Sequence, residues 1–114
     1  PLAGNNPLSK ALSKAPEQDK TKLYHLLDCV IERSAKLAAV NLAATALKTG
    51  KGKDPCKPIC IVAEGTTFYK CKDLGFKTHF YLKNFLTDQK GVYFDIVNIE
   101  NSTLIGAAVA GLTN

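Results

Sequence analysis

The chain has 114 residues, of which 46% are hydrophobic, and a formal net charge of +5 at pH 7. Hydrophobic content at this level is sufficient for a packed core and excludes an intrinsically disordered protein. No apolar run approaches the roughly 20 residues that a membrane helix needs, so no membrane partner is expected. The chain contains no methionine, and we therefore expect residues 1–114 to be a single segment of a larger protein.

The basic side chains are scattered except for one concentration of lysines between Lys48 and Lys57. Glycines and a proline in the same stretch are typical of a solvated loop. Nucleic-acid modules usually interleave aromatic residues with basic ones, and none occur here, so a nucleic-acid partner is not expected. A non-catalytic binding module that recruits an anionic partner through this basic face remains an alternative function.

Three cysteines and a histidine follow a spacing that could be mistaken for a zinc site, namely Cys56, Cys60, Cys71 and His79. If Cys56 and Cys60 both lie in extended backbone, four residues separate them by about 13 Å. Thiolates that share a zinc ion lie much closer together, because each metal–sulfur bond is about 2.3 Å long. The interpretation is therefore that the cysteines are reduced, that the chain has no metal site and that the protein is cytoplasmic.

The first half of the chain is predicted to be helical. Asn6 can cap a short helix that begins at Pro7, and a long helix follows from about Asp19 to Lys48. A stripe recurs along it at helical spacing, formed by Leu23, Leu27, Val30, Ser34, Leu37 and Asn41. The second half of this helix is rich in alanine, which permits close approach of another element, so we expect it to pack against the sheet. Gly50 is expected to end the helix.

The run Ile59–Ala63 is apolar without alternation, which is typical of a strand covered on both faces in a parallel sheet. Glu64 and Gly65 end the run, and two hydroxyl residues, Thr66 and Thr67, follow at once. Open α/β sheets bind ligands at the carboxyl ends of their strands. Gly65 would let a ligand approach the main chain, and its neighbours would supply donors. The alternative is an ordinary turn in which the threonines only satisfy backbone amides.

Strands and helices are predicted to alternate in the second half. Thr67–Lys70 is predicted as a short strand, and Asp73 as the cap of a helix at about Leu74–Asp88. A second strand is predicted at Val92–Ile99, where the two faces differ in apolar character.

An apolar helix is predicted from Leu104 to Leu112, with Ser102 or Thr103 as its cap. The order is then helix, helix, strand, optional short strand, helix, strand, helix, an α/β arrangement with a short parallel sheet. Two or three strands make a poor independent sheet. We therefore expect the remainder of a larger domain, or a second copy, to complete the core.

Three stretches resemble the carboxyl-terminal part of the hexokinases. Val62–Lys70 is similar to that family's strand ending in Asp-Gly-Ser/Thr and then an aromatic residue. Glu100–Ala110 is similar to its closing Glu-x-Gly-Ser-Gly-x-Gly-Ala-Ala helix, and Glu32–Val40 to its Arg-Ala-Ala-x-Leu helix. The three stretches occur in the same order and at similar spacing over most of the chain.

The resemblance implies a partial actin-like (ribonuclease H-like) ATPase domain, the carboxyl-terminal segment of a sugar kinase that phosphorylates a hexose such as glucose. It implies ATP with Mg²⁺ as cofactors, and the nucleotide, the hexose and the remaining kinase chain as partners. Gly65 and Thr66 would lie against the phosphates or ribose of the nucleotide, with Thr67 beside them as a further cofactor-binding residue. Ser102 and Thr103 would face the adenosine side.

Two features depart from the family pattern. Glu64 stands where the family has an aspartate, and Ser102-Thr103-Leu104 where it has Gly-Ser-Gly. The phosphate loop and the catalytic aspartate of the hexokinases have no counterpart among the aspartates of this chain. Phosphoryl transfer depends on positioning and charge neutralisation, so the isolated chain is expected to be inactive and to hold no catalytic residue. A small assembly domain, in which the alanine-rich helix packs against a second copy, is a further alternative.

Overall fold

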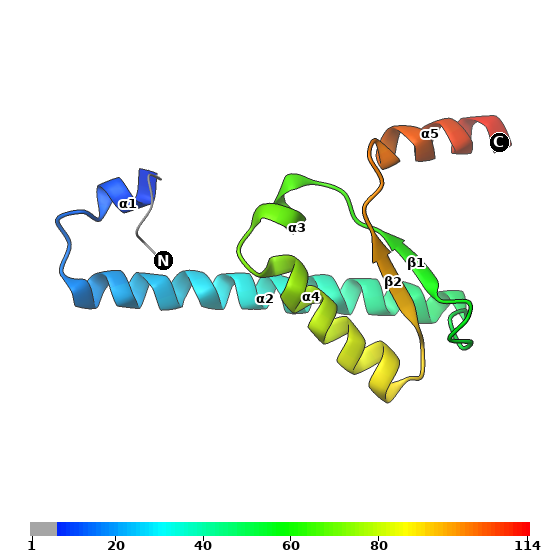
Figure 1. Ribbon diagram of the computed structural model, residues 1–114, viewed down its shortest axis with the longest axis horizontal. Coiled ribbons are helices and arrows are strands. Elements are labelled where there is room, and N and C mark those ends of the chain that lie inside the picture. Colours follow the sequence, from blue (N-terminus) through cyan, green and yellow to red (C-terminus); the bar gives the residue numbers. More distant parts are fainter. Residues whose placement is uncertain (1–6) are drawn as a thin grey trace.

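The computed structural model describes residues 7–114, and its elements are arranged around one long helix (Figure 1). The helices are α1 (Pro7–Ala11), α2 (Glu17–Thr49), α3 (Thr66–Lys70), α4 (Leu74–Leu82), the π-helix η1 (Lys83–Gln89) and α5 (Ser102–Thr113). The strands are β1 (Ile59–Val62) and β2 (Phe94–Val97). This order confirms the predicted mixture of helices with a short parallel sheet. The cap predicted at Asn6 lies outside the described residues.

The long helix α2 spans Glu17–Thr49, close to the predicted range of Asp19–Lys48. Both Glu17 and Asp19 lie in its first turn, where the helix dipole stabilises negative charge. Gly50 follows in the left-handed conformation with a φ of 67°, and its N–H donates to the Leu47 carbonyl at 3.2 Å. The prediction that Gly50 ends this helix is confirmed. None of the helices within residues 7–114 combines the length and apolar character needed to cross a lipid bilayer.

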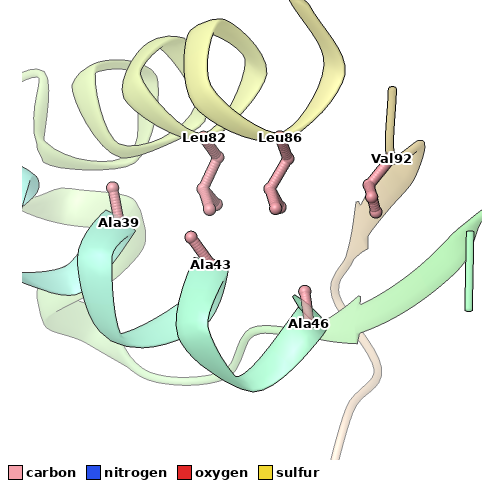
Figure 2. Packing of buried hydrophobic residues seen from close by; sticks show 6 residues of the cluster. All are labelled: Ala39, Ala43, Ala46, Leu82, Leu86 and Val92. Carbon is pink, nitrogen blue, oxygen red and sulfur yellow. The ribbon is translucent and has the colours of Figure 1, made fainter. Parts of the chain in front are cut away.

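The core lies where α2 meets α4, η1 and the segment before β2 (Figure 2). Its buried members are Ala39, Ala43, Ala46, Leu82, Leu86 and Val92. The small alanine side chains let α4 and η1 approach α2 closely, and the leucines fill the space above them. The prediction that the alanine-rich half packs against the sheet is therefore only partly right. The leucines of α4 and η1 face the alanines, and strand residues such as Ile59 and Phe94 reach the cluster at its margin.

The leucine and valine stripe predicted along α2 is largely exposed. Val30 and Leu37 keep 55% and 56% of their area accessible to solvent. The buried residues of α2 are instead Ala35, Ala39, Ala43 and Ala46. The helix thus buries its alanine face under α4, because that face permits the closer contact. The stripe is exposed from Leu27 to Asn41, and only Leu23 is partly buried.

Charged and polar side chains of α4 form ion pairs and a hydrogen bond with the middle of α2. The Lys77 ammonium lies 2.7 Å from the Glu32 carboxylate and 3.5 Å from that of Asp28. The Tyr81 hydroxyl donates a hydrogen bond to Glu32 as well. The hydrogen bond to Glu32 is the largest cause that raises the pKa of Lys77 above its ordinary value. These contacts fix the crossing of the two helices beside the core.

Strands β1 and β2 form a two-stranded parallel sheet, as the strand–helix–strand order predicts. Ile59 pairs with Phe94, and Val62 pairs with Val97. Contrary to prediction, β1 is not covered on both faces, because burial alternates along it and Cys60 and Val62 are exposed. One face meets the core, and within residues 7–114 no second layer covers the other.

The stretch predicted as a short strand at Thr67–Lys70 belongs to the helix α3. A strand needs a neighbour to pair its backbone groups, and the described chain offers none here. The chain folds back instead, and the Tyr69 hydroxyl donates to the Ala63 carbonyl at 2.8 Å. This hydrogen bond ties α3 to the end of β1.

Two further predicted elements differ from the structure. The helix predicted at Leu74–Asp88 divides into α4 and the π-helix η1. Asp73 precedes it in the left-handed conformation, with a φ of 58° and no side-chain capping hydrogen bond. The strand predicted at Val92–Ile99 shortens to β2, because the Val92 N–H donates to the Leu86 carbonyl at 2.8 Å and its side chain enters the core.

The chain leaves more surface exposed than a self-contained domain of its mass. Its accessible area is 8415 Å², whereas a compact monomer of this mass exposes about 6,100 Å². Its radius of gyration is 18.3 Å, against about 13 Å for a compact chain of this length. Helix α5 contains no buried residue and stands apart from α2 in Figure 1. These values support the expectation that further polypeptide completes the core.

Candidate functional site

Two loops meet at one edge of the sheet. Strands β1 and β2 run parallel, so their carboxyl ends lie together, with Val62 beside Val97. The Ala63 N–H extends the pairing by donating to the Val97 carbonyl at 2.9 Å. The loop after β1 leads through Gly65 into α3, and the loop after β2 leads through Asn101 into α5. The predicted site residues all lie on these two loops or in the first turns of the helices that follow them.

The loop after β1 leaves its backbone and hydroxyl groups accessible. Gly65 has a φ of 114° and a ψ of 150°, a conformation that essentially only glycine adopts. A Cβ atom built at this position meets no atom within 4 Å, so the space beside the main chain is open. Thr66 and Thr67 are exposed, and neither hydroxyl forms a hydrogen bond to another residue of the described chain. The alternative interpretation, in which these hydroxyls satisfy turn amides, does not match this arrangement.

The Glu64 side chain bridges the two loops. Its Oε2 atom accepts hydrogen bonds from the Ser102 hydroxyl, from the Thr103 N–H at 3.0 Å and from the Thr103 hydroxyl at 2.9 Å. The pKa of Glu64 is lowered chiefly by the Ser102 hydrogen bond and further by those from Thr103. The carboxylate is therefore held in its charged form at the start of α5. The turn after β1 and the beginning of the last helix lie side by side.

The cap of α5 differs from the predicted one. Asn101 is the residue before the helix, in the left-handed conformation with a φ of 56° and no side-chain capping hydrogen bond. Ser102 is the first helical residue, so neither it nor Thr103 acts as the cap. Glu64 supplies the missing acceptor from 39 residues away in sequence. The sequence signal for this contact is Glu64 itself, which stands where the family has an aspartate. Its additional methylene extends the reach of the carboxylate.

The predicted site residues therefore differ in whether they form a hydrogen bond to Glu64. Ser102 and Thr103 bind the Glu64 carboxylate directly. Thr66 and Thr67 follow Gly65 on the first loop, and Glu64 is the link between that loop and α5. Among residues 7–114 there is no cluster of three or more His, Cys, Asp or Glu side chains that could hold a metal ion. The arrangement offers hydroxyl and backbone donors beside one anchored carboxylate.

A family model described as Hexokinase matches residues 5–113. The chain belongs to the hexokinase family. No curated protein and no solved structure matches it. The match covers nearly the whole chain and includes both loops of the site, and it bears out the resemblance carried by the three sequence motifs.

Membership of the hexokinase family favours a sugar-kinase segment over the two alternatives considered from the sequence. A basic-face module and an assembly domain both relied on general features, namely the concentration of lysines between Lys48 and Lys57 and an alanine-rich helix. The alanine face is already covered by α4 within the chain itself. In this hexokinase segment the exposed hydroxyl residues Thr66 and Thr67 lie at the carboxyl edge of the sheet.

Proposed function

We propose that this chain is the nucleotide-binding segment of a hexokinase-type sugar kinase, in which ATP binds at the carboxyl edge of the β1–β2 sheet. Gly65, Thr66 and Thr67 contact the nucleotide from one loop, and Ser102 and Thr103 contact it from the other. The parent enzyme transfers the terminal phosphoryl group of ATP to a hexose such as glucose. Its location is cytoplasmic, and its cysteines remain reduced.

The observation that carries this proposal is the bridge formed by Glu64. Its hydrogen bonds to Ser102 and Thr103 hold the Gly65 turn beside the start of α5. A nucleotide is long enough to span two such loops, and parallel sheets commonly bind nucleotides at this edge. Membership of the hexokinase family supports ATP as the ligand, and the Glu64 bridge supports a shared location for the predicted residues.

The donor set suits a nucleotide better than a metal ion. Gly65 leaves open space beside the backbone, and the exposed hydroxyls of Thr66 and Thr67 can donate to phosphate or ribose oxygens. ATP, when bound, supplies the phosphoryl group that the enzyme transfers. The described residues form no metal cage of their own. No role for Mg²⁺ is therefore assigned to a side chain of this segment.

Catalysis requires groups that this segment lacks. The aspartates of the chain do not match the phosphate loop or the catalytic base of the hexokinase pattern. Phosphoryl transfer without a base and without charge neutralisation is slow. The remainder of the kinase chain supplies both, and the isolated segment has no useful glucose kinase activity.

Titration of the isotope-labelled chain with ADP tests the proposal by nuclear magnetic resonance. We expect the backbone amide signals of Gly65, Thr66 and Ser102 to shift with a common affinity. Gly65→Val should remove these shifts, because the side chain fills the open space beside the main chain. Saturating ADP that leaves the wild-type signals unchanged would contradict the proposal.

Gly91→Val provides the matched control. Gly91 also has a positive φ, of 63°, and open space around its Cβ position. It lies before β2, at the opposite edge of the sheet from the proposed site. The control variant should therefore also place a β-branched side chain on backbone with a positive φ, and it should retain the response to ADP. Equal loss of the response in both variants would attribute the effect of Gly65→Val to strain rather than to the site.

A further inference from the structure

The start of α5 is already occupied by a negative charge from the chain itself. The first N–H groups of a helix have no partner within the helix and normally attract anions such as phosphate. Here the Thr103 N–H and the hydroxyls of Ser102 and Thr103 all donate to one oxygen of Glu64. A phosphate could bind these donors only by displacing the Glu64 carboxylate. The negative charge of that carboxylate would also repel the phosphate as it approached.

The other loop of the site has no such occupant. The hydroxyls of Thr66 and Thr67 form no hydrogen bond to the described residues, and the space beside Gly65 is open. The two corners of the site therefore differ in charge and in the availability of their donors. This asymmetry depends on a single side chain.

We propose that Glu64 is a positioning residue that closes the start of α5 to phosphate, so that this corner accepts only an uncharged part of the nucleotide. The inference rests on the proposed nucleotide-binding function and assigns to Glu64 the control of how the nucleotide is oriented. Glu64 acts through Ser102 and Thr103, whose donors it occupies.

Adenosine and pyrophosphate, used as separate probes, test this role in the full 114-residue chain. In the wild-type chain, adenosine should shift the amide signals of Ser102 and Thr103, whereas pyrophosphate should leave them unchanged. Glu64→Gln keeps an oxygen at nearly the same reach but removes the charge. In this variant pyrophosphate should shift the Thr103 signal with an affinity at least tenfold higher than in the wild type, while the response to adenosine persists.

Glu100→Gln is the matched control, because it removes the same charge two residues before α5. The Glu100 carboxylate forms no hydrogen bond to the described residues, so this variant should respond as the wild type does. A gain of pyrophosphate binding in Glu100→Gln equal to that in Glu64→Gln would overturn the inference, since general charge would then explain both. A merely structural role of Glu64 predicts no gain in either variant, and that result would overturn it too.

The responses to ADP and to pyrophosphate together distinguish a wrong role for Glu64 from a wrong nucleotide site. ADP that shifts both loops of the wild type, together with pyrophosphate that shifts Thr103, overturns the role of Glu64 alone. ADP that shifts neither loop overturns the nucleotide site and this inference with it. If α5 loses its helical signals in Glu64→Gln, a shift of the Thr103 signal by pyrophosphate in the wild-type chain would still overturn the role of Glu64.

Discussion

The carboxylate of Glu64, on the loop after β1, accepts a hydrogen bond from the backbone N–H of Thr103, 3.0 Å away in the first turn of α5. Ser102 donates to the same oxygen. Helix α5 contains no buried residue, so these contacts are the principal side-chain anchor of that helix to the sheet. The position of α5 therefore depends on the charge state and the length of one side chain.

The anchoring of α5 should depend on acidity. The pKa of Glu64 in the folded chain lies below its ordinary value of 4.5, because the Ser102 and Thr103 donors stabilise the ionised form. A lowered pKa in the folded state means that the stabilisation is complete above the ordinary value and is lost as the pH falls through the folded-state value. We expect the amide signals of the first turn of α5 to move in this acidic range. In Glu64→Gln the same signals should be insensitive to pH there, and an identical titration in both chains would contradict the assignment.

Gly52→Ala should destabilise the fold strongly. Gly52 is buried with a φ of 79°, and a Cβ atom there would lie 2.8 Å from the Tyr93 carbonyl and 2.9 Å from Ile59 Cγ1. Overpacking and left-handed strain together should lower the free energy of unfolding by about 2–4 kcal/mol. Urea denaturation measures the change. Gly106→Ala, in open space within α5, should instead be neutral or stabilise the helix by up to about 1 kcal/mol.

Leu86→Ala should show how much of the stability resides in the contact between η1 and α2. Leu86 is fully buried against the alanine face of α2. Truncation should lower the free energy of unfolding by about 2–5 kcal/mol, because it removes apolar contact and leaves a cavity. Leu112→Ala serves as the comparison, since Leu112 is 88% exposed, and it should change the stability by less than about 0.5 kcal/mol. A similar loss of unfolding free energy in both variants would show that Leu86 does not belong to the core.

Lys77→Met should loosen the crossing of α4 on α2. Lys77 pairs with Glu32 and Asp28, and its raised pKa means that this stabilisation is complete below the ordinary value of 10.5 and is lost as the pH rises through the folded-state value. At neutral pH the variant should melt at a lower temperature than the wild type in a thermal unfolding scan. Lys83→Met removes a charge from the exposed side of η1 and should leave the melting temperature nearly unchanged. A common shift in both variants would indicate an effect of net charge.

Much of the candidate site follows from the order of elements in the sequence. An apolar run, a glycine turn and a second run separated by a helix predict a parallel pair, and a parallel pair places both following loops at one edge. The sequence alone therefore assigns Gly65, Thr66, Ser102 and Thr103 to one region. It does not assign the capping of α5, because its acceptor comes from a different loop and the sequence pattern favoured Ser102 or Thr103.

The sequence by itself determined where the backbone turns and how the strands run. Gly50 ends α2 because only a residue without a side chain adopts the left-handed conformation at little cost, and the connection between β1 and β2 requires them to be parallel. The tertiary structure alone decided which face of α2 is buried and what holds α5 in place. Alanine and leucine stripes both satisfy a helical period, and the choice between them depends on how closely α4 can approach. The bond between Glu64 and Thr103 likewise exists only because the fold brings together two residues that are 39 positions apart.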